Sequence, residues 1–393
     1  MRPPHRVWAE IDLAALRHNL ARIRRAAGRR QVWPVLKANA YGHGAVAVAR
    51  TCAAAGAPRL GVGDSGEALD LREGGIETPL LVLGTVIDAE VPALLRHRVE
   101  VGVHSESRVR MLGAAARRAG VRLGVHLKID TGMGRLGVRP EAAVRVARAV
   151  AEEPALELRG VMTHYASPDG CLDPATAEQT EVFRRALAEI AAAGLSLPPI
   201  HAANSAVLFT AGEPFGDAVR PGIALYGILP SGLPGAAKLR PVLSLRAQIV
   251  FLKDVPAGTP VGYGGRWRST GSKTRLAVLP IGYNDGLPYR LGAEGRGAAL
   301  VRGRRCPIVG AISMDYCTID VSRVEGVQVG DVATLVGGDG DERIRVQEVA
   351  EAAGTIPYEI TCSLGARVRR IPVDRTEPAA AGPAAAAAAF LGA

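Results

Sequence analysis

Residues Val99 to Ile129 read VEVGVHSESRVRMLGAAARRAGVRLGVHLKI and contain the repeating pattern that decides the fold. The apolar run Val99–Val103 is typical of a short buried strand. Ser105 is a capping residue at the start of a segment with helical periodicity, Ser105–Ala119. A second apolar run, Gly124–Ile129, follows. Strands that alternate with helices in this way indicate β–α units and a parallel sheet.

The same alternation extends over more than half of the chain. We expect eight strands, around Val32–Leu36, Leu60–Gly63, Leu80–Leu83, Val99–Val103, Gly124–Ile129, Leu158–Thr163, Ile200–Ala203 and Gly222–Tyr226. Further helices are expected at Leu13–Ala27, capped by Asp12, and at Glu67–Arg72, Pro140–Ala151 and Thr176–Ala193. Eight such repeats predict a TIM (β/α)8 barrel, whose chemistry lies at the C-terminal ends of the strands. A doubly wound sheet is the alternative, but no G-x-G-x-x-G motif follows the first strand.

The pattern changes after Leu239, where short β-rich segments alternate with Gly, Pro and Asp turns. They lie at Ser244–Leu252, Thr274–Pro280, Gly297–Val301, Arg304–Ile308, Cys317–Asp320 and Asp331–Leu335. We therefore expect a barrel over residues 1–239 and a mostly β domain over 240–376, which the early strand at residues 6–11 can join. Residues 337–341 read as a hairpin turn rather than a calcium loop, because the later Glu is missing. The Ala-rich tail 377–393 is expected to be disordered.

Composition narrows the class of protein. With 393 residues, 48% hydrophobic and 22% charged, the chain is expected to form two soluble domains. It contains no apolar stretch of membrane-spanning length, and Met1–Asp12 lacks the apolar core of a signal peptide, so we expect a cytoplasmic protein. Five scattered cysteines argue against a disulfide framework or a zinc site, and no metal is expected.

The charge balance singles out the lysines. The net charge is +10, but the positive residues are dispersed and aromatics are 4%, which disfavours a nucleic-acid partner. Of the 48 Lys and Arg residues only five are Lys, at positions 37, 128, 238, 253 and 273. A Lys retained in such a chain can mark a site that needs an amine able to lose its proton. Codon bias is the alternative explanation.

Two of these lysines follow predicted strands. Lys37 lies in V-L-K-A-N-A-Y-G-H-G, Val35 to Gly44, at the expected catalytic end of the barrel. In a partly dry site its amine becomes nucleophilic and can form a Schiff base with an aldehyde such as pyridoxal phosphate. A Lys that snorkels from a strand end is the alternative. Lys128 begins K-I-D-T-G-M-G-R-L-G, in which Arg135 offers a planar fork for a carboxylate; a charged surface loop is the alternative.

Three further motifs end the last predicted strands. T-H-Y-A places His164 after the sixth strand, where a structural histidine is the alternative to a catalytic one. H-A-A-N-S-A offers Asn204 and Ser205 as short polar groups for an anion or a ring oxygen. R-P-G-I-A-L-Y-G, Arg220 to Gly227, offers the backbone N–H groups of Gly222 and Ile223, where TIM barrels usually hold phosphate.

Together the five motifs closely resemble the alanine racemases, the pyridoxal phosphate enzymes of bacterial D-amino acid supply. The resemblance runs from about Val7 to Arg370. In the β-rich part it includes V-G-Y-G-G-R-W (Val261–Trp267), I-G-Y-N-D-G (Ile281–Gly286), S-M-D (Ser313–Asp315) and P-Y-E-I (Pro357–Ile360).

The resemblance implies a role for each matching position in the barrel. Lys37 would carry the cofactor, Arg220 would face its pyridine nitrogen, and His164 would support Arg220. Arg135 would contact the ring hydroxyl side and the substrate carboxylate, and Lys128 would be carbamylated so as to position Arg135. The phosphate would be held by Tyr41, Ser205, Gly222, Ile223 and Tyr358.

For the β domain the resemblance implies a homodimer with shared active sites. Tyr263 would be the second base and Met314 would offer its backbone N–H to the substrate carboxylate, both in the partner's site. Tyr283 and Tyr358 would narrow the entrance. Gly262, where serine is frequent, and Asn284–Leu287 depart from the family pattern as we know it, which leaves the substrate breadth open.

The resemblance thus implies two-base racemisation of L- and D-alanine, which supplies D-alanine for peptidoglycan. The chemistry requires one base on each face of the cofactor plane. The alternatives are a racemase of broader amino-acid range, a decarboxylase of the same architecture, and a non-catalytic pyridoxal phosphate carrier or regulator.

Overall fold

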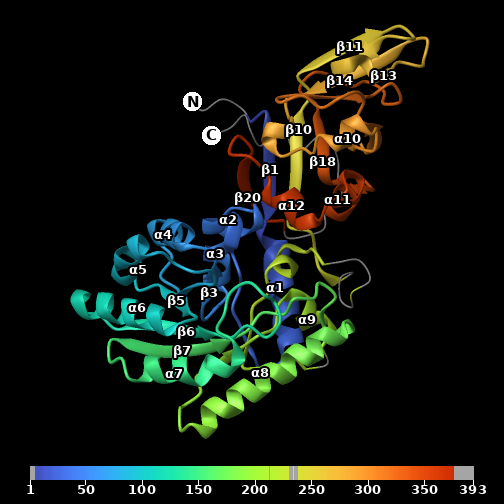
Figure 1. Ribbon diagram of the computed structural model, residues 1–393. Coiled ribbons are helices and arrows are strands. Elements are labelled where there is room, and N and C mark those ends of the chain that lie inside the picture. Colours follow the sequence, from blue (N-terminus) through green and yellow to red (C-terminus); the bar gives the residue numbers. More distant parts are fainter. Residues whose placement is uncertain (1–4, 212, 230–232, 234–237, 376–393) are drawn as a thin grey trace. The chain divides into compact units, whose positions relative to one another are not determined.

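The computed structural model describes residues 5–211, 213–229, 233 and 238–375, and the predicted tail 377–393 lies outside this range. The chain divides into two compact units (Figure 1). Leu16–Arg240 forms the barrel unit, and Met1–Ala15 together with Pro241–Ala393 forms the β unit. Each unit is described by itself below.

The barrel unit contains an eight-stranded parallel sheet in the order β2-β9-β8-β7-β6-β5-β4-β3. A parallel bridge between Val35 and Gly61 joins the two ends of this order, so that the sheet curls into a closed barrel. The predicted TIM-like architecture is confirmed. The strands are β2 (Gln31–Val32), β3 (Leu60–Val62), β4 (Leu80–Val82), β5 (Glu100–Val103), β6 (Leu123–Lys128), β7 (Leu156–Met162), β8 (Ile200–His201) and β9 (Ala218–Val219).

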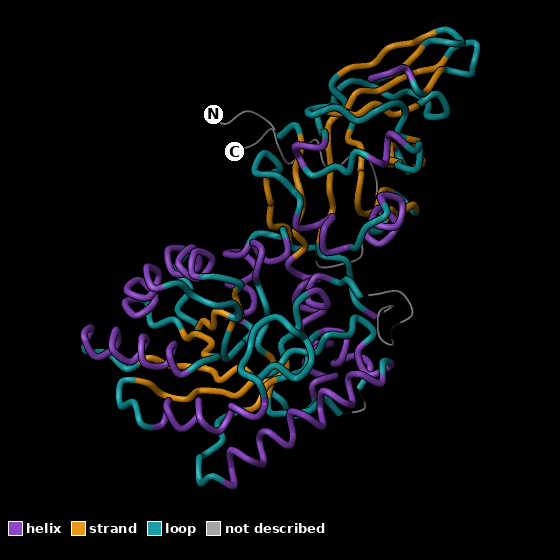
Figure 2. Tube along the Cα trace, viewed as in Figure 1, coloured by secondary structure: helices purple, strands orange, loops and turns teal. Residues whose placement is uncertain are grey.

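Helices cover the outside of the barrel, as Figures 1 and 2 show. Asp12 accepts a hydrogen bond from the Ala15 N–H (3.0 Å), and Ser105 accepts one from the Arg108 N–H (3.2 Å), so both predicted caps are present. The helices are α1 (Leu13–Ala27), α3 (Ala45–Ala54), α4 (Ser65–Glu73), α5 (Val91–Arg96), α6 (Glu106–Ala119), α7 (Ala143–Ala151), α8 (Pro174–Ala192) and α9 (Ser205–Thr210).

The position of the eighth strand was predicted wrongly. The strand is β9, Ala218–Val219, whereas the predicted strand Gly222–Tyr226 contains a 3-10 helix, Ile223–Tyr226. The run I-A-L-Y is buried in this single turn, which Gly227 ends with a φ of 79°. Short buried helices and strands have the same apolar composition, so the run alone could not distinguish them.

The β unit is built on a seven-stranded sheet in the order β16-β15-β18-β10-β1-β20, with β19 paired to β18. Its first strand, β1, pairs antiparallel with β10 and parallel with β20. Smaller sheets follow the orders β11-β14-β17 and β12-β13. The bounds are β1 (Val7–Asp12), β10 (Leu243–Gln248), β11 (Phe251–Val255), β12 (Pro260–Val261), β13 (Trp267–Arg268), β14 (Thr274–Leu279), β15 (Ala298–Val301), β16 (Arg304–Pro307), β17 (Cys317–Asp320), β18 (Val332–Asp339), β19 (Glu342–Ile344) and β20 (Arg369–Val373).

Two details of this unit bear on the sequence analysis. The predicted strand Ser244–Leu252 is two strands in different sheets, β10 and β11, because the pairing changes between them: the Ile249 N–H donates to Asp331, beside β18, and the Val250 N–H to Val278 of β14. The glycine-rich segment at residues 337–341 is a hairpin between β18 and β19, as predicted. The described part of this unit also contains three short α-helices, α10 (Arg290–Ala293), α11 (Val346–Ala353) and α12 (Pro357–Cys362).

Candidate active site

Lys37 begins a turn of unusual backbone geometry just after the first barrel strand. The four residues Ala38 to Tyr41 all have φ between 51° and 55°, which is the left-handed region. For residues with a Cβ, this conformation costs roughly 1–2 kcal/mol each. The surrounding structure must hold the turn in place, and strain of this kind is concentrated at functional sites.

Hydrogen bonds from two directions hold the turn. Glu67 of α4 accepts from the Ala38 N–H and, through its other oxygen, from the Gly63 N–H (2.7 Å). Asn39 accepts from the Ala45 N–H at the start of α3 (2.8 Å). The Lys37 side chain is exposed, and its Nζ lies 5.9 Å from the ring centroid of buried Tyr41.

Tyr41, Ser205 and Gly222 meet near the end of β9. The Ser205 hydroxyl accepts from the N–H groups of Gly222 (3.0 Å) and Ala224 (3.2 Å). A Cβ at position 222 would lie only 2.2 Å from the Tyr41 hydroxyl oxygen, so a glycine is required there. Asn204 caps α9 by accepting from the Val207 N–H (3.0 Å). The result is a small cradle of hydroxyl and amide groups.

Arg220 is buried at the end of β9 and held by the neighbouring strand ends. Its Nη1 donates to the His201 carbonyl (2.6 Å) and lies 2.9 Å from the His201 Nδ1. Its Nη2 donates to the carbonyls of Thr163 (2.7 Å) and Ala202 (3.1 Å) and lies 3.3 Å from the His164 Nδ1. The guanidinium is therefore oriented by groups on β7 and β8.

The loop that follows β6 carries Arg135, whose side chain is exposed. Asp130 organises this loop, because one of its carboxylate oxygens accepts from the N–H groups of residues 132, 133 and 134 at 3.0–3.1 Å. The base of the loop is closed where the Val138 N–H donates to the Lys128 carbonyl (2.8 Å). Arg135 thus projects from a short, internally bonded loop.

Positive charges crowd Lys128, which is only 8% exposed. Its Nζ donates to the Leu83 carbonyl (3.4 Å). Burial, together with the charges of Arg220 and Arg135, lowers the pKa of Lys128 to about 8. Burial and the Arg220 charge likewise hold the pKa of His164 well below its usual range. Burial lowers the pKa of Arg220 to about 10, which leaves it charged at neutral pH.

The remaining predicted site residues belong to the β unit. Tyr263 lies in a one-turn helix between glycines of positive φ and is 76% exposed. Met314 and Tyr283 are also exposed, and their loops are joined where the Tyr283 N–H donates to the Ser313 carbonyl (3.1 Å). Tyr358, in α12, is 38% exposed, and burial of the hydroxyl raises its pKa.

The loop Ile281–Gly286 is pinned by a buried carboxylate. Asp285 accepts from the Gly282 N–H (2.9 Å) and from two nitrogens of Arg367 (2.9 and 3.1 Å). The same guanidinium donates to Asp315, which neighbours Met314 (2.7 Å). Residues 284–287, where a departure from the family pattern is expected, therefore lie in or directly after a well-anchored loop.

Comparison with known proteins accounts for both units. Residues 11–230 match the family profile described as the alanine racemase N-terminal domain, and residues 242–372 match the C-terminal domain. The alanine racemase of Methanococcus maripaludis is 40% identical over 371 residues, which cover 93% of this chain and 98% of that one. The chain belongs to the alanine racemase family. It is accordingly an isomerase that acts on amino acids.

Solved structures of alanine racemases agree with this assignment. The enzyme of Bacillus anthracis, solved with bound L-Ala-P, is 34% identical, has a TM-score of 0.88, and covers 96% of this chain and 97% of that one. The enzyme of Bartonella henselae, solved with covalently bound pyridoxal phosphate, is 28% identical with a TM-score of 0.83; the coverages are 94% and 100%. Among the described residues of this family member, no helix is long and apolar enough to cross a membrane.

No role was predicted for a set of polar residues beneath the barrel mouth of this racemase: the buried Glu100, His126 and His201 and the half-buried Arg59. A signal was present, because His126 and Lys128 are two residues apart on β6 and so share one face of the strand. An apolar strand with polar residues at alternate positions directs them all to one side. In a closed barrel a shared face can be the packed interior.

Proposed function

We propose that this chain racemises alanine with pyridoxal phosphate, using Lys37 and Tyr263 as bases on opposite faces of the α-carbon. The observation that carries the proposal is the convergence of Lys37, the Tyr41–Gly222 cradle and Arg220 at the C-terminal ends of one set of barrel strands. TIM barrels place their chemistry at this end.

The residues present suit the cofactor. Gly222 leaves open the space that a Cβ would fill beside the Tyr41 hydroxyl, and the Ser205 hydroxyl lies at hydrogen-bond distance from the same backbone. Hydroxyls and backbone N–H groups are suitable donors to a phosphate. We assign the phosphate to Tyr41, Ser205, Gly222 and Ile223, with Asn204 beside them and Tyr358 contributed by the β unit.

The covalent and ring contacts follow from the remaining groups. The exposed amine of Lys37 would hold the cofactor through its aldehyde carbon. Arg220 would face the pyridine nitrogen and, as a guanidinium, would not surrender a proton to it. His164 supports Arg220 from 3.3 Å. When bound, the cofactor delocalises the electron pair left on the α-carbon, so that the α-proton becomes removable.

Two bases then exchange that proton with the α-carbon. Lys37 takes the α-proton of D-alanine while Tyr263 donates a proton to the opposite face; in the reverse direction Tyr263 takes the α-proton of L-alanine and Lys37 donates a proton from its own face. Arg135 and the Met314 N–H hold the substrate carboxylate. A carbamate on Lys128 would place a negative charge near Arg135 and so orient it.

We also propose a cytoplasmic homodimer in which Tyr263 and Met314 complete the site of the partner. The D-alanine that it makes would supply peptidoglycan. The exposure of Tyr263, at 76%, supports this proposal, because a base must be covered by other groups when it acts and little of its own chain covers it.

The decisive experiment is isotope washout by the Tyr263→Ala variant. A general base contributes roughly a hundred- to ten-thousand-fold, so racemisation should slow by about that factor. Lys37 still acts on its own face, so α-deuterium should wash out of D-alanine into water much faster than D-alanine racemises. L-alanine should retain its label. Equal washout from both enantiomers would contradict the assignment of Tyr263 to the L side.

The competing functions give different results with the wild-type protein. A non-catalytic carrier would bind pyridoxal phosphate at Lys37 yet produce no D-alanine. A racemase of broader range would convert other amino acids with comparable kcat/KM, a possibility that the loop 284–287 makes worth testing. Borohydride reduction and peptide mapping locate the cofactor, and Lys37→Ala should abolish the label.

A further inference from the structure

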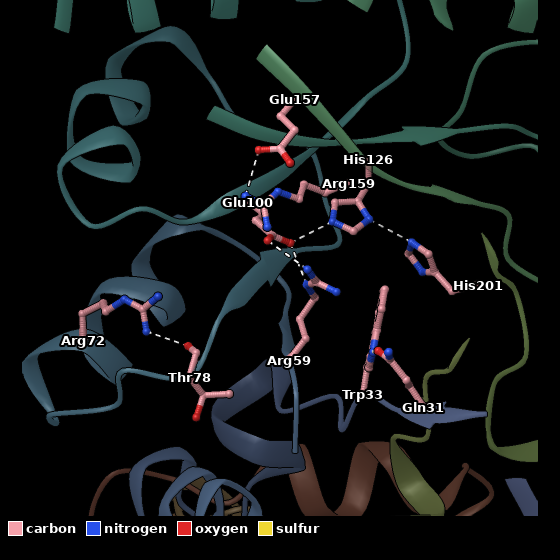
Figure 3. Close-up of polar contacts among 10 residues, drawn as sticks. All are labelled: Gln31, Trp33, Arg59, Arg72, Thr78, Glu100, His126, Glu157, Arg159 and His201. Carbon is pink, nitrogen blue, oxygen red and sulfur yellow. Dashed lines mark hydrogen bonds and ion pairs between the residues drawn. The ribbon is translucent and has the colours of Figure 1, made fainter. Parts of the chain in front are cut away.

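A hydrogen-bonded network of polar side chains, called the polar network below, crosses the interior of the barrel, a region that apolar residues usually fill. His201 Nδ1 lies 2.9 Å from Arg220 Nη1, and His201 Nε2 lies 2.9 Å from His126 Nδ1. His126 Nε2 lies 2.8 Å from a carboxylate oxygen of Glu100. Arg59 holds Glu100 with two hydrogen bonds of 2.6 and 3.0 Å. Figure 3 shows four side chains of this polar network, Arg59, Glu100, His126 and His201.

The donors of Arg220 allow the direction of every hydrogen bond in this polar network to be assigned. A guanidinium has only donors, so the Nδ1 of His201 must accept. Its proton is then on Nε2, which donates to the Nδ1 of His126. The Nε2–H of His126 in turn donates to Glu100. Both imidazoles are therefore neutral and carry their proton on Nε2.

The electrostatic environment agrees with neutral imidazoles. Both histidines are fully buried, and burial lowers the pKa of His126 and holds the pKa of His201 well below its usual range. Burial acts to raise the pKa of Glu100, but hydrogen bonds from His126 and Arg59 outweigh it and bring the value to about 2. The two neutral imidazoles thus lie between the Glu100 carboxylate and the Arg220 guanidinium.

The fold makes room for the two histidines. Gly160 of β7 pairs with His126 of β6, just after a register shift between the strands. A Cβ at position 160 would lie 2.3 Å from the Nδ1 of His126 and 2.8 Å from the Nε2 of His201. Trp33 packs beside the polar network, with its ring centroid 4.5 Å from that of His201 and 4.3 Å from the Cζ of Arg59. Any larger residue at 160 would disrupt the pair.

The polar network extends from one end of the barrel to the other. Glu100 is the first residue of β5, and its side chain, 11% exposed, lines an open cavity of about 860 Å³. Arg220 follows the last residue of β9. Transfer of protons along this path would require Arg220 to release one, which a guanidinium does not do. The role that remains for the polar network is to position Arg220, because a fixed acceptor, the His201 Nδ1, orients the guanidinium that donates to it.

We propose that His126, held by Glu100, is a positioning residue for Arg220: it keeps His201 in the one tautomer that accepts from the guanidinium. The inference rests on the proposed function, in which Arg220 faces the cofactor ring. Loss of the His126 acceptor lets the His201 proton move to Nδ1, where it would oppose the guanidinium donor.

The first test uses the wild-type protein and needs no activity. Imidazole 15N chemical shifts of protein labelled at its eight histidines, with and without pyridoxal phosphate, report tautomer and charge. We expect His126 and His201 each as a single neutral Nε2–H form across pH 6 to 9. A charged or Nδ1–H form of His201 would overturn the proposal. This readout stands even if the protein does not racemise alanine, a result that would refute only the proposed function.

The second test compares two substitutions of the same residue. His126→Leu keeps the approximate volume but removes the acceptor, and His126→Asn places an amide oxygen near the position of Nδ1. We expect kcat to fall about tenfold or more in the Leu variant with a smaller change in KM, as is usual when an outer orienting partner is lost. The Asn variant should recover most of kcat. The tautomer signal of His201 should become mixed in the Leu variant alone.

A matched control uses the neighbouring ion pair between Glu157 and Arg159, which is partly exposed and does not belong to the polar network. Glu157→Gln should leave kcat and the His201 signal unchanged. Equal losses in the Leu and Asn variants, with an unaltered His201 tautomer, would show that His126 only fills space and would overturn the proposal. If the Leu variant does not fold, His126→Ala, which also removes the acceptor, takes its place, with the same expected and contradicting results.

Discussion

Lys128 shows how the burial of a single side chain sets its chemistry. An ordinary Lys with a pKa near 10.5 is almost entirely protonated at neutral pH, whereas a pKa of about 8 leaves about a tenth of the amine neutral at pH 7. Only the neutral amine adds to CO2, and the addition releases protons. The two neighbouring arginines that disfavour the ammonium also favour the resulting anion.

We therefore predict that carbamylation of Lys128 increases with pH between 7 and 9 at a fixed concentration of dissolved CO2, and reverses on acidification. Native mass spectrometry should detect the added mass of one CO2 per chain. Lys128→Ala should lower kcat about tenfold, with partial recovery in acetate or chloride. An unmodified amine in both native mass spectra and a crystal structure would contradict the carbamate.

Gly222 is required because it has no Cβ, which leaves space for the Tyr41 hydroxyl. Gly222→Ala would place a methyl group 2.2 Å from the Tyr41 hydroxyl oxygen, so the ring must move. We predict that the Kd for pyridoxal phosphate rises at least about tenfold, because one phosphate donor is displaced. Gly66→Ala, at an exposed position of α4 whose added Cβ meets one atom at 3.4 Å, should leave the Kd unchanged. Titration of the apoprotein measures both, and equal affinities would exclude the cradle from phosphate binding.

At the scale of elements, the turn from Ala38 to Tyr41 is the longest run of left-handed residues other than glycine within the described part of the chain. It is short, and Glu67 and Asn39 hold it through hydrogen bonds to backbone N–H groups. Strain of this kind ties the direction of Lys37 to the packing of α3 and α4. A relaxed, right-handed turn would point the amine elsewhere.

This geometry predicts an inversion of the usual effect of glycine. In a right-handed helix, Ala→Gly costs about 1 kcal/mol, as expected for Ala188→Gly at an exposed position of α8. Ala38→Gly, at a φ of 53°, relieves left-handed strain and should leave the free energy of unfolding unchanged or higher. Urea unfolding of the two variants provides the comparison. Equal losses of stability would mean that Ala38 is not left-handed in solution.

At the scale of the whole molecule, the proposed bases lie in different compact units, Lys37 in the barrel unit and Tyr263 in the β unit. In a homodimer with shared sites, Lys37→Ala and Tyr263→Ala chains damage different halves of each site. A hybrid dimer then contains one site with both bases intact. Random pairing should restore about a quarter of the wild-type activity from two inactive parents.

The measurement is racemisation after the two variants are unfolded together, mixed and refolded, with each variant refolded alone as the control. If both bases of a site came from the same chain, mixing would restore nothing. A result of that kind would leave the racemase assignment in place and remove only the shared site.

The sequence by itself determined the architecture and predicted where in it the site lies. Eight apolar runs separated by helices lead to a parallel barrel, and in a barrel every strand ends at the same face. Residues as distant as Lys37 and Arg220 could therefore be assigned to one place from their position at strand ends alone. The motifs around these residues showed the resemblance to the family, because each motif is a short, contiguous stretch of sequence.

Only the tertiary structure decided which side chains meet inside that barrel. The chain from Glu100 through His126 to His201 depends on register, on the shift beside Val125 and on the space left by Gly160, all of which are relations between strands. The left-handed turn at Lys37 likewise depends on Glu67 of another helix. Such contacts are long-range, and a pattern read along one strand specifies the face of each residue but not its partner across the barrel.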